Sequence, residues 1–321
     1  MGAKKARKAN GRSNGYGSRS APEWAQFLGT EGYEWFIRQV EQYFAGRQQL
    51  VTVTDDGVIF LPGPDDQQHS FGLLNLAQTC ARLEASEWPE VIARHFDTAQ
   101  QSWSELDRMK TAAQDFDQVC DQLRVRLFPA DVAQASAPLL YRPALPDTIE
   151  VLVYDLPSSI QSVRPADARQ WGLAEEELFR IGRRNVQQTS QVQVIEQSLD
   201  RGAVVLVLLG DEFYTASRAL MLDPYLPADA QHGALVGVPT RALVFLHIIR
   251  DITVIEAINS LLLGTLRAYQ DGPGSLSPYL YWYRNGEYVT LPARPVGDQL
   301  EFTPPAEFME LITLLTADRA D

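Results

Sequence analysis

The residues best suited to chemistry are three aspartates at the predicted ends of strands, together with four histidines. Asp155, Asp211 and Asp251 each follow an apolar stretch, and carboxylates placed in this way can form the general acid–base pair of a hydrolase. The histidines are His69, His95, His232 and His247. Aspartate also bonds backbone amides in turns, which is the simpler interpretation. A hydrolase with a site assembled from scattered Asp, Glu and His therefore stays an alternative function.

The sequence contains none of the common catalytic or nucleotide-binding motifs in a suitable context. Walker A, Gly-x-Gly-x-x-Gly and His-Glu-x-x-His sequences are absent. Gly11-Arg-Ser-Asn-Gly15 matches the nucleophile elbow of hydrolases by letter, but no strand precedes it, so we regard the match as chance. Two cysteines, Cys80 and Cys120, are too few for a disulfide scaffold or a cysteine-based zinc site. We expect no metal and no cofactor, and we name no catalytic residue.

Aromatic residues crowd one predicted hairpin near the C-terminus. They are Tyr279, Tyr281, Trp282, Tyr283 and Tyr288. Alternation along a strand places Tyr281 and Tyr283 on one face and Trp282 on the other. Aromatic side chains with polar tips are frequent anchors of binding surfaces. Two interpretations stay open: these residues bind a partner, or they form a two-sided sheet edge that the C-terminal helix covers.

The N-terminal tail differs in charge from the rest of the chain. Residues 1–20 contain six bases and no acid, so the remainder keeps 22 of the 28 Lys and Arg against all 41 Asp and Glu. The candidate anion-binding residues of the tail are Lys4, Lys5, Arg7, Lys8 and Arg12. The tail is rich in Gly, Asn and Ser, and it cannot bury enough surface to offset its ordering entropy, so we expect residues 1–22 to be disordered. The tail either binds nucleic acid or another anion, or is simply solvated.

The composition of the whole chain excludes several classes of protein. Its 321 residues are 45% hydrophobic and carry a net charge of −13, which excludes a generally basic nucleic-acid coat. No run of 18 apolar residues occurs, and the basic N-terminus lacks the apolar core of a secretory signal. We therefore expect a cytoplasmic protein that does not contact a membrane.

Residues 90–127 show the most regular hydrophobic pattern in the chain. Apolar or aromatic residues recur at every third or fourth position, and no Gly or Pro intervenes before Pro129. The pattern predicts one long helix, or two shorter ones. This segment either self-associates along its apolar stripe or packs on the protein's own core. Ala, Trp, Met and Cys occupy seam positions in place of Leu and Ile, which favours packing on the core.

The patterns together predict an α+β fold in three regions. After the disordered tail of residues 1–22, residues 23–128 are expected to be mainly helical, with a hairpin at 50–61 around Asp56-Gly57. Residues 129–321 are expected to form an α+β domain, a mixed and largely antiparallel sheet with packed helices, because predicted strands arrive in pairs between helices. Asn285-Gly286 is the strongest hairpin turn in the sequence.

Several short blocks carry a family resemblance over residues 127–292. In chain order they are Leu127-Phe-Pro129, Val153-Tyr-Asp-Leu-Pro157, Trp171-Gly-Leu-Ala-Glu-Glu-Glu-Leu178, Asp211-Glu-Phe-Tyr-Thr-Ala-Ser-Arg218, Gly233-Ala-Leu-Val-Gly-Val-Pro239 and Tyr281-Trp-Tyr-Arg-Asn-Gly-Glu-Tyr288. This order resembles the YtpQ-like family of bacterial proteins, whose function is unknown. The resemblance implies a bacterial cytosolic protein of mixed fold, and it brings no activity or catalytic residue. The basic tail departs from the family pattern.

These observations favour a non-catalytic protein-interaction module. Its expected partner is another protein, or a second copy that associates through residues 90–127. The hydrolase described above is one alternative. Nucleic-acid association through the basic tail is the other.

Overall fold

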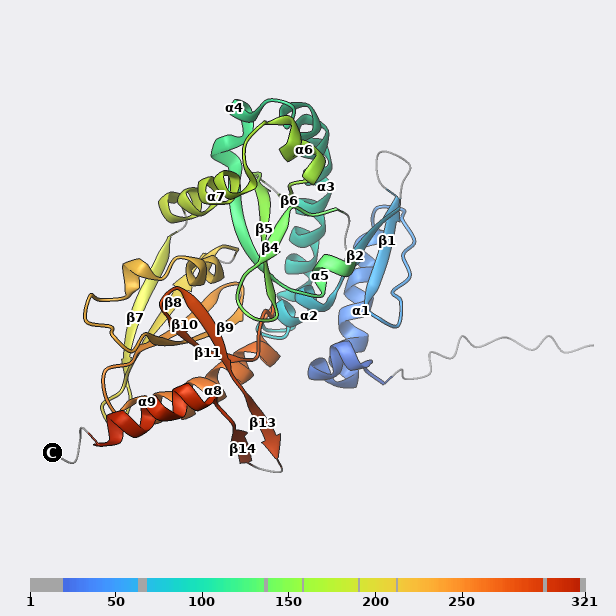
Figure 1. Cartoon of the computed structure of the whole chain (residues 1–321). Coiled ribbons are helices and arrows are strands. Elements are labelled where there is room, and N and C mark those ends of the chain that lie inside the picture. The colour runs from blue at the N-terminus through green and yellow to red at the C-terminus, as the bar shows by residue number, and fades with distance from the viewer. Residues whose placement is uncertain are drawn as a thin grey trace, which may run out of the picture. The chain divides into compact units, whose positions relative to one another are not determined.

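The computed structural model describes residues 20–62, 68–135, 138–157, 159–189, 191–211, 213–296 and 299–317. The chain divides into two compact units between Arg94 and His95. Figure 1 shows the elements of both units. The predicted anion-binding residues lie outside the described part of the chain: Lys4, Lys5, Arg7, Lys8 and Arg12. Within the described ranges, no helix is long and apolar enough to cross a membrane.

The N-terminal unit is mainly helical and holds one two-stranded antiparallel sheet. Its elements are η1 (Glu23–Leu28), α1 (Gly29–Ala45), β1 (Val58–Pro62), β2 (Gln68–Gly72), α2 (Leu74–Cys80) and the beginning of α3 (Trp88–Ala112). Helix α1 buries one face because Phe36, Val40 and Phe44 recur at a spacing of four residues. The Phe36 ring meets the edge of Trp88 at a centroid distance of 6.4 Å.

The hairpin of this unit lies later in the chain than the sequence predicts. Strands β1 and β2 pair with Val58 opposite Gly72, whereas the prediction places the turn itself at Asp56-Gly57. The Gly57 N–H donates to the Thr54 carbonyl at 3.0 Å and closes a turn that precedes β1. Gly57 has a φ of 73°, and a Cβ there would lie 2.5 Å from Cε2 of Trp24. Position 57 therefore requires glycine because the backbone lies close to the Trp24 ring. Gly57 is not part of the turn between β1 and β2.

The C-terminal unit contains a four-stranded antiparallel sheet. Strand β5 (Thr148–Asp155) lies between β3 (Leu123–Pro129) and β4 (Tyr141–Pro143), and it also pairs with β6 (Ile160–Ser162). Every position of β5 except Asp155 is buried. The associated helices are α4 (Phe116–Val119), η2 (Cys120–Gln122), α5 (Val132–Ala135), α6 (Pro165–Gln170) and α7 (Glu175–Thr189). Helix α7 packs closely on this sheet, because a Cβ on Gly182 would lie 2.9 Å from Leu152 and Val125 side-chain atoms.

The stripe at 90–127 is not one helix. Helix α3 ends at Ala112, and a new short helix begins where the Asp115 side chain accepts the N–H of Asp117 at 3.1 Å. The last part of the stripe, Leu123-Arg-Val-Arg-Leu127, alternates apolar and charged residues with the period of a strand, and it pairs with β5. The expected domain boundary near 128 accordingly falls within β3.

The larger sheet of the C-terminal unit has six antiparallel strands in the order β12-β11-β9-β10-β8-β7. The strands are β7 (Val192–Ser198), β8 (Val204–Gly210), β9 (Ala234–Thr240), β10 (Leu243–Ile248), β11 (Leu280–Arg284) and β12 (Glu287–Leu291). A separate hairpin, β13 (Ala293–Val296) with β14 (Gln299–Phe302), follows. The remaining helices are η3 (Thr215–Leu220), η4 (Asp223–Tyr225), α8 (Val254–Asp271) and α9 (Ala306–Ala317).

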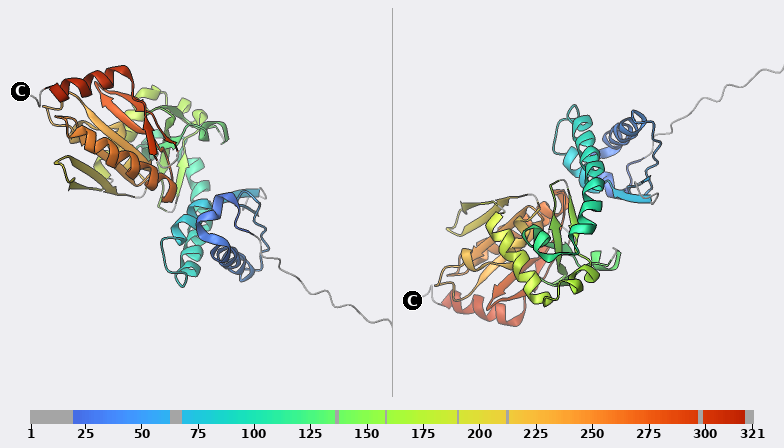
Figure 2. Two further views of the ribbon diagram at one scale, coloured as in Figure 1. Left: turned by 90° about the horizontal axis from the view of Figure 1, so that it is seen from below. Right: turned by 90° about the horizontal axis from the view of Figure 1, so that it is seen from above.

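Both faces of the six-stranded sheet are covered over its central strands. Helices α8 and α9 lie on one face, as the views in Figure 2 show, and their apolar residues share a core with Leu235 and Trp282. Gly237 admits α8 closely, because a Cβ there would lie 2.3 Å from the Thr265 hydroxyl. On the other face, Ala216 and Ala219 of η3 pack against the sheet. The predicted α+β class, with a largely antiparallel sheet and packed helices, is confirmed.

The β11–β12 hairpin agrees with its sequence signal. Asn285 and Gly286 have φ values of 53° and 83°, so both central turn residues adopt the left-handed conformation that this dipeptide favours. Arg284 then lies opposite Glu287, and Tyr283 opposite Tyr288.

Candidate functional site

The central aromatic residues of the predicted binding hairpin lie in the core. Tyr281 is 0% exposed and Trp282 is 4% exposed. The Trp282 ring lies 5.2 Å from Phe308 of α9, and its indole N–H donates to the His232 carbonyl at 2.8 Å. Tyr281 points to the opposite face, where its hydroxyl donates to the Pro146 carbonyl at 3.0 Å. The structure thus favours the second sequence-based interpretation, a sheet edge covered on two sides.

The outer tyrosines of this hairpin are less buried. Tyr283 and Tyr288 are half-buried, and their rings pack at a tilt of 52° with centroids 4.8 Å apart. The Tyr288 hydroxyl donates to the Ala219 carbonyl of η3, and burial raises the pKa of Tyr288 well above its ordinary value. Tyr279 is the most exposed of the five. The Tyr288 hydrogen bond therefore attaches the hairpin to η3. Of the five aromatic side chains only Tyr279 is exposed, so they form no continuous aromatic surface.

The three strand-end aspartates all bond to neighbouring protein groups. Asp155 accepts the Tyr214 hydroxyl hydrogen bond at 2.8 Å and lies 3.7 Å from Nε of Arg124. Asp211 accepts the backbone N–H groups of Phe213 and Tyr214 at 2.8 and 3.1 Å. The contacts of Asp211 are those expected of an aspartate that closes a turn, whereas Asp155 bonds to side chains from two other segments.

The third aspartate, Asp251, lies in a hollow at the N-terminal end of α8. The hollow has a volume of about 640 Å³ and is lined by Arg201, Arg250, Asp251, Ile252, Thr253, Ile255, Glu256 and Leu315. Oδ1 of Asp251 accepts the N–H of Thr253 at 2.8 Å and its hydroxyl at 2.5 Å, and these bonds lower the pKa of Asp251. Asp251 therefore stabilises the beginning of α8.

His247 lies close enough to Asp251 for their charges to interact, yet its surroundings are those of a core residue. It is buried, and Nδ1 lies 2.8 Å from the Val204 carbonyl. Burial lowers the pKa of His247, and the Asp251 and Glu256 carboxylates oppose this shift less strongly. The Thr253 hydroxyl donates to Asp251 and not to the imidazole, so these three residues do not form an activated nucleophile. The described residues also hold no group of three or more His, Cys, Asp or Glu that could bind a metal ion.

Glu256 positions the hairpin that β7 and β8 form. Its two carboxylate oxygens accept the backbone N–H groups of Arg201 and Ala203 at 2.7 and 3.1 Å. The turn between the strands reverses at Gly202, which has a φ of 96°. One carboxylate at the beginning of α8 thus holds the turn, and the hairpin extends from it with β7 outermost (Figure 1).

Strand β7 is an exposed sheet edge. It pairs with β8 at all positions from Val192 to Ser198, and no strand of the described part of the chain pairs with its other side. Every position except Val192 is exposed, including Val194 at 43% and Ile195 at 41%. The neighbouring residue Val204 on β8 is also exposed.

The sequence of β7 lacks the features that usually block pairing at an edge. Such features are lysine, proline, a bulge or very short length. Val192-Gln-Val-Ile-Glu-Gln-Ser198 has one charged residue, Glu196, and its register with β8 is continuous. The hydrophobic pattern of the sequence predicts this strand. It does not predict the edge position, because tertiary pairing decides the order of strands in a sheet. Its alternation is also weak, because Val194 and Ile195 point to opposite faces.

Comparisons with protein-family models, with curated proteins and with solved structures found no match. The resemblance to the YtpQ-like family therefore stays a prediction.

Proposed function

We propose that this protein is a non-catalytic interaction module that binds an extended segment of a partner protein beside β7. The observation that carries the proposal is the exposed, continuous and nearly uncharged edge of a sheet whose central strands are covered on both faces. An unpaired edge presents a row of backbone N–H and C=O groups to which another strand can bond. Backbone hydrogen bonds then supply affinity, and side-chain contacts on the two faces supply specificity.

The side chains around β7 indicate which partner segment fits. Val194 lies opposite Leu208 and Ile195 opposite Val207, so the two exposed side chains lie on different faces of the sheet. Val204 lies on the same face as Val194, because alternate residues of β8 share a face. A partner strand with apolar, β-branched or aromatic residues at alternating positions would cover these side chains.

Charge favours a neutral or basic partner over a second copy. The chain has a net charge of −13, so two copies repel each other, whereas a basic segment is attracted. β7 itself contributes Glu196 as its one charge. We therefore assign the edge to a different protein, and self-association becomes an outcome that the experiment can detect.

Selection of displayed peptides on the full-length protein tests this proposal. We expect enrichment of extended sequences with alternating apolar residues and basic flanks. In calorimetric titrations, a selected peptide should bind Val194→Lys and Ile195→Lys at least about tenfold more weakly than the unchanged protein, since each lysine removes apolar contact and must be desolvated. Leu263→Lys is the matched control, because Leu263 on α8 is 47% exposed and distant in sequence from the edge.

Three results would overturn the proposal. These are no enrichment, selected peptides without the alternating pattern, and equal affinity for Ile195→Lys and Leu263→Lys. If the protein forms dimers at micromolar concentration and Ile195→Lys abolishes them, then the molecule that binds β7 is a second copy of the chain.

We also propose a cytoplasmic location. Both cysteines, Cys80 and Cys120, are free thiols, which suits a reducing compartment. Fractionation of cells that produce the native protein tests the location, and recovery outside the cytoplasm would contradict it.

A further inference from the structure

Arg126 on β3 is a partly buried cation. No hydrogen bond or ion pair joins its side chain to any described residue, and its Nε is buried. The guanidinium carbon lies 4.9 Å from the ring centroid of Phe128 and 5.7 Å from that of Phe213. Aromatic faces attract a guanidinium, but they do not satisfy its N–H groups. A partly buried arginine left in this state is costly, so its position requires an explanation.

A second arginine faces the same ring. The guanidinium carbon of Arg241 lies 5.3 Å from the centroid of Phe213. The Arg241 backbone N–H donates to the Gly274 carbonyl at 2.9 Å, and a Cβ on Gly274 would lie 2.6 Å from Cδ of Arg241. The absence of a side chain at Gly274 thus makes room for this arginine. Burial and the like charge of Arg241 lower the pKa of Arg126 to about 10.

The nearby carboxylates are bonded to other groups. Asp155 accepts from Tyr214 and lies beside Arg124, and Asp211 accepts from two backbone amides. Both attract Arg126 electrostatically, but neither bonds to it. Arg124 thus has Asp155 as its ion-pair partner, whereas Arg126 has no bonded anion among the described residues.

We propose that Arg126 binds a compact oxyanion, the carboxylate or phosphate group of a small molecule, beside the exposed ring of Phe213 and near Arg241. The planar guanidinium presents paired N–H donors that match either group. An oxyanion would satisfy the donors that the described residues leave unbonded on Arg126 and reduce the repulsion between the two arginines. This site is separate from the proposed function, because it involves β3 and two loops and not β7.

Titration of the full-length protein with inorganic phosphate and with malonate tests the site. Both titrations are done by calorimetry at constant ionic strength and neutral pH. We expect at least one of the two anions to bind the unchanged protein, and its dissociation constant should rise by about tenfold or more in Arg126→Met. The comparison of the two anions shows whether the site takes phosphate or carboxylate groups. Arg180→Gln is the control of equal charge change, because Arg180 lies on the surface of α7.

Arg126→Met is expected to fold, since methionine keeps much of the side-chain volume and removes an unsatisfied cation. Its thermal midpoint without added anion should equal or exceed that of the unchanged protein. Binding of either anion that is lost in Arg126→Met and kept in Arg180→Gln supports the site. The proposal is overturned if neither anion binds the unchanged protein, or if Arg126→Met binds as tightly.

Discussion

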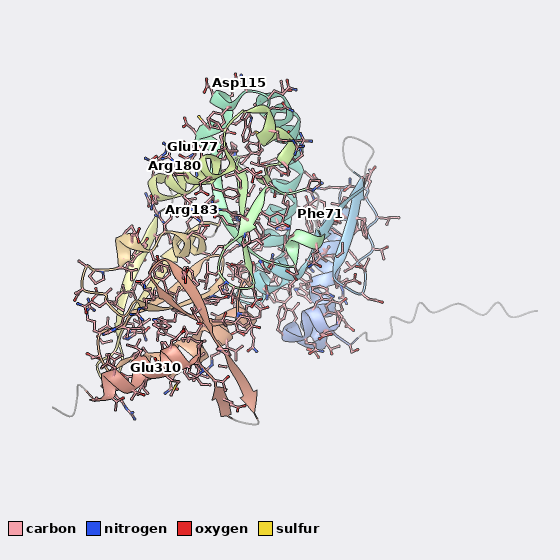
Figure 3. All side chains as sticks on the ribbon, viewed as in Figure 1. Phe71, Asp115, Glu177, Arg180, Arg183 and Glu310 are labelled. Carbon is pink, nitrogen blue, oxygen red and sulfur yellow. The ribbon has the colours of Figure 1, made fainter. Side chains whose placement is uncertain are left out.

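Arg183 of α7 and Glu150 of β5 form a two-pronged ion pair in the C-terminal unit. Nε and Nη2 of Arg183 donate to the two carboxylate oxygens of Glu150, each at 2.7 Å, and Glu150 has no exposed surface. Arg142 of β4 donates to the same carboxylate at 2.7 Å. One buried carboxylate thus joins α7 to the middle of the four-stranded sheet. Figure 3 shows Arg183 on α7 with Glu177 and Arg180.

Replacement of the buried carboxylate should destabilise the protein strongly. Glu150→Gln leaves Arg183 without its anion and Arg142 with Glu176 alone, and breaking a buried pair from one side costs about 3 kcal/mol. Urea unfolding followed by tryptophan fluorescence measures the change in the free energy of unfolding.

The matched control is an exposed pair on the same helix. Glu177 accepts two hydrogen bonds from Arg180, but this pair is open to solvent, so Glu177→Gln should leave the unfolding midpoint nearly unchanged. Equal destabilisation by the two substitutions would show that burial does not distinguish these carboxylates.

Trp282 should contribute to stability and not to partner binding. Trp282→Ala removes a buried ring that packs on Phe308, and such a change costs about 3 kcal/mol or more. Tyr279→Ala, on the exposed residue of the same segment, should cost much less. The measurement is thermal unfolding of both variants, together with their affinity for a peptide selected on the full-length protein. If Trp282→Ala keeps its stability but loses peptide binding, then the aromatic hairpin, and not β7, contains the binding surface.

The sequence predicts local structure well wherever one period is unambiguous. The Asn285-Gly286 turn, the apolar strand β5 and the helix at 254–271 agree with their patterns. Residues 123–127 fit both the helical stripe and a strand, because positions 123 and 127 satisfy either period. Pairing with β5 decides between the two periods, and sequence spacing alone cannot show it.

The sequence predicts the candidate sites less well than the local structure, because tertiary contacts decide which side chains are exposed. The aromatic hairpin has the composition of a binding surface, but α9 and the residues around Pro146 cover its two faces. Nothing in the local pattern reveals these contacts. The edge position of β7 and the unbonded state of Arg126 are likewise results of tertiary pairing.

Gly57 offers a test of close packing in the N-terminal unit. Gly57→Ala adds a methyl group beside Trp24 at a positive φ, so it combines backbone strain with overpacking and should cost about 2 kcal/mol or more. Gly29→Ala is the control, since Gly29 has a φ of 65° but a Cβ added there would meet no atom within 4 Å. Thermal unfolding should show the larger loss for Gly57→Ala. Equal losses would mean that the Trp24 contact contributes nothing.

Stability should decrease when the pH falls below about 6.5, partly because of His247. Burial holds the pKa of His247 below its ordinary value of 6.5, so the unfolded chain takes up a proton that the folded chain resists. This penalty is absent at higher pH and grows as the pH falls. His247→Gln should reduce the slope of the unfolding free energy against pH between pH 7 and about pH 5. An unchanged slope would contradict the buried, neutral state of this imidazole.

Addition of a partner strand to β7, as proposed, should be visible in the amide hydrogen exchange of that strand. A peptide selected on the full-length protein is compared with buffer alone, and Ile195→Lys serves as the control protein. We predict that exchange slows by about tenfold or more at alternating amides of Val192–Ser198, those that point away from β8, and that Ile195→Lys shows no such protection. Slower exchange confined to other segments, with β7 unchanged, would contradict strand addition at β7.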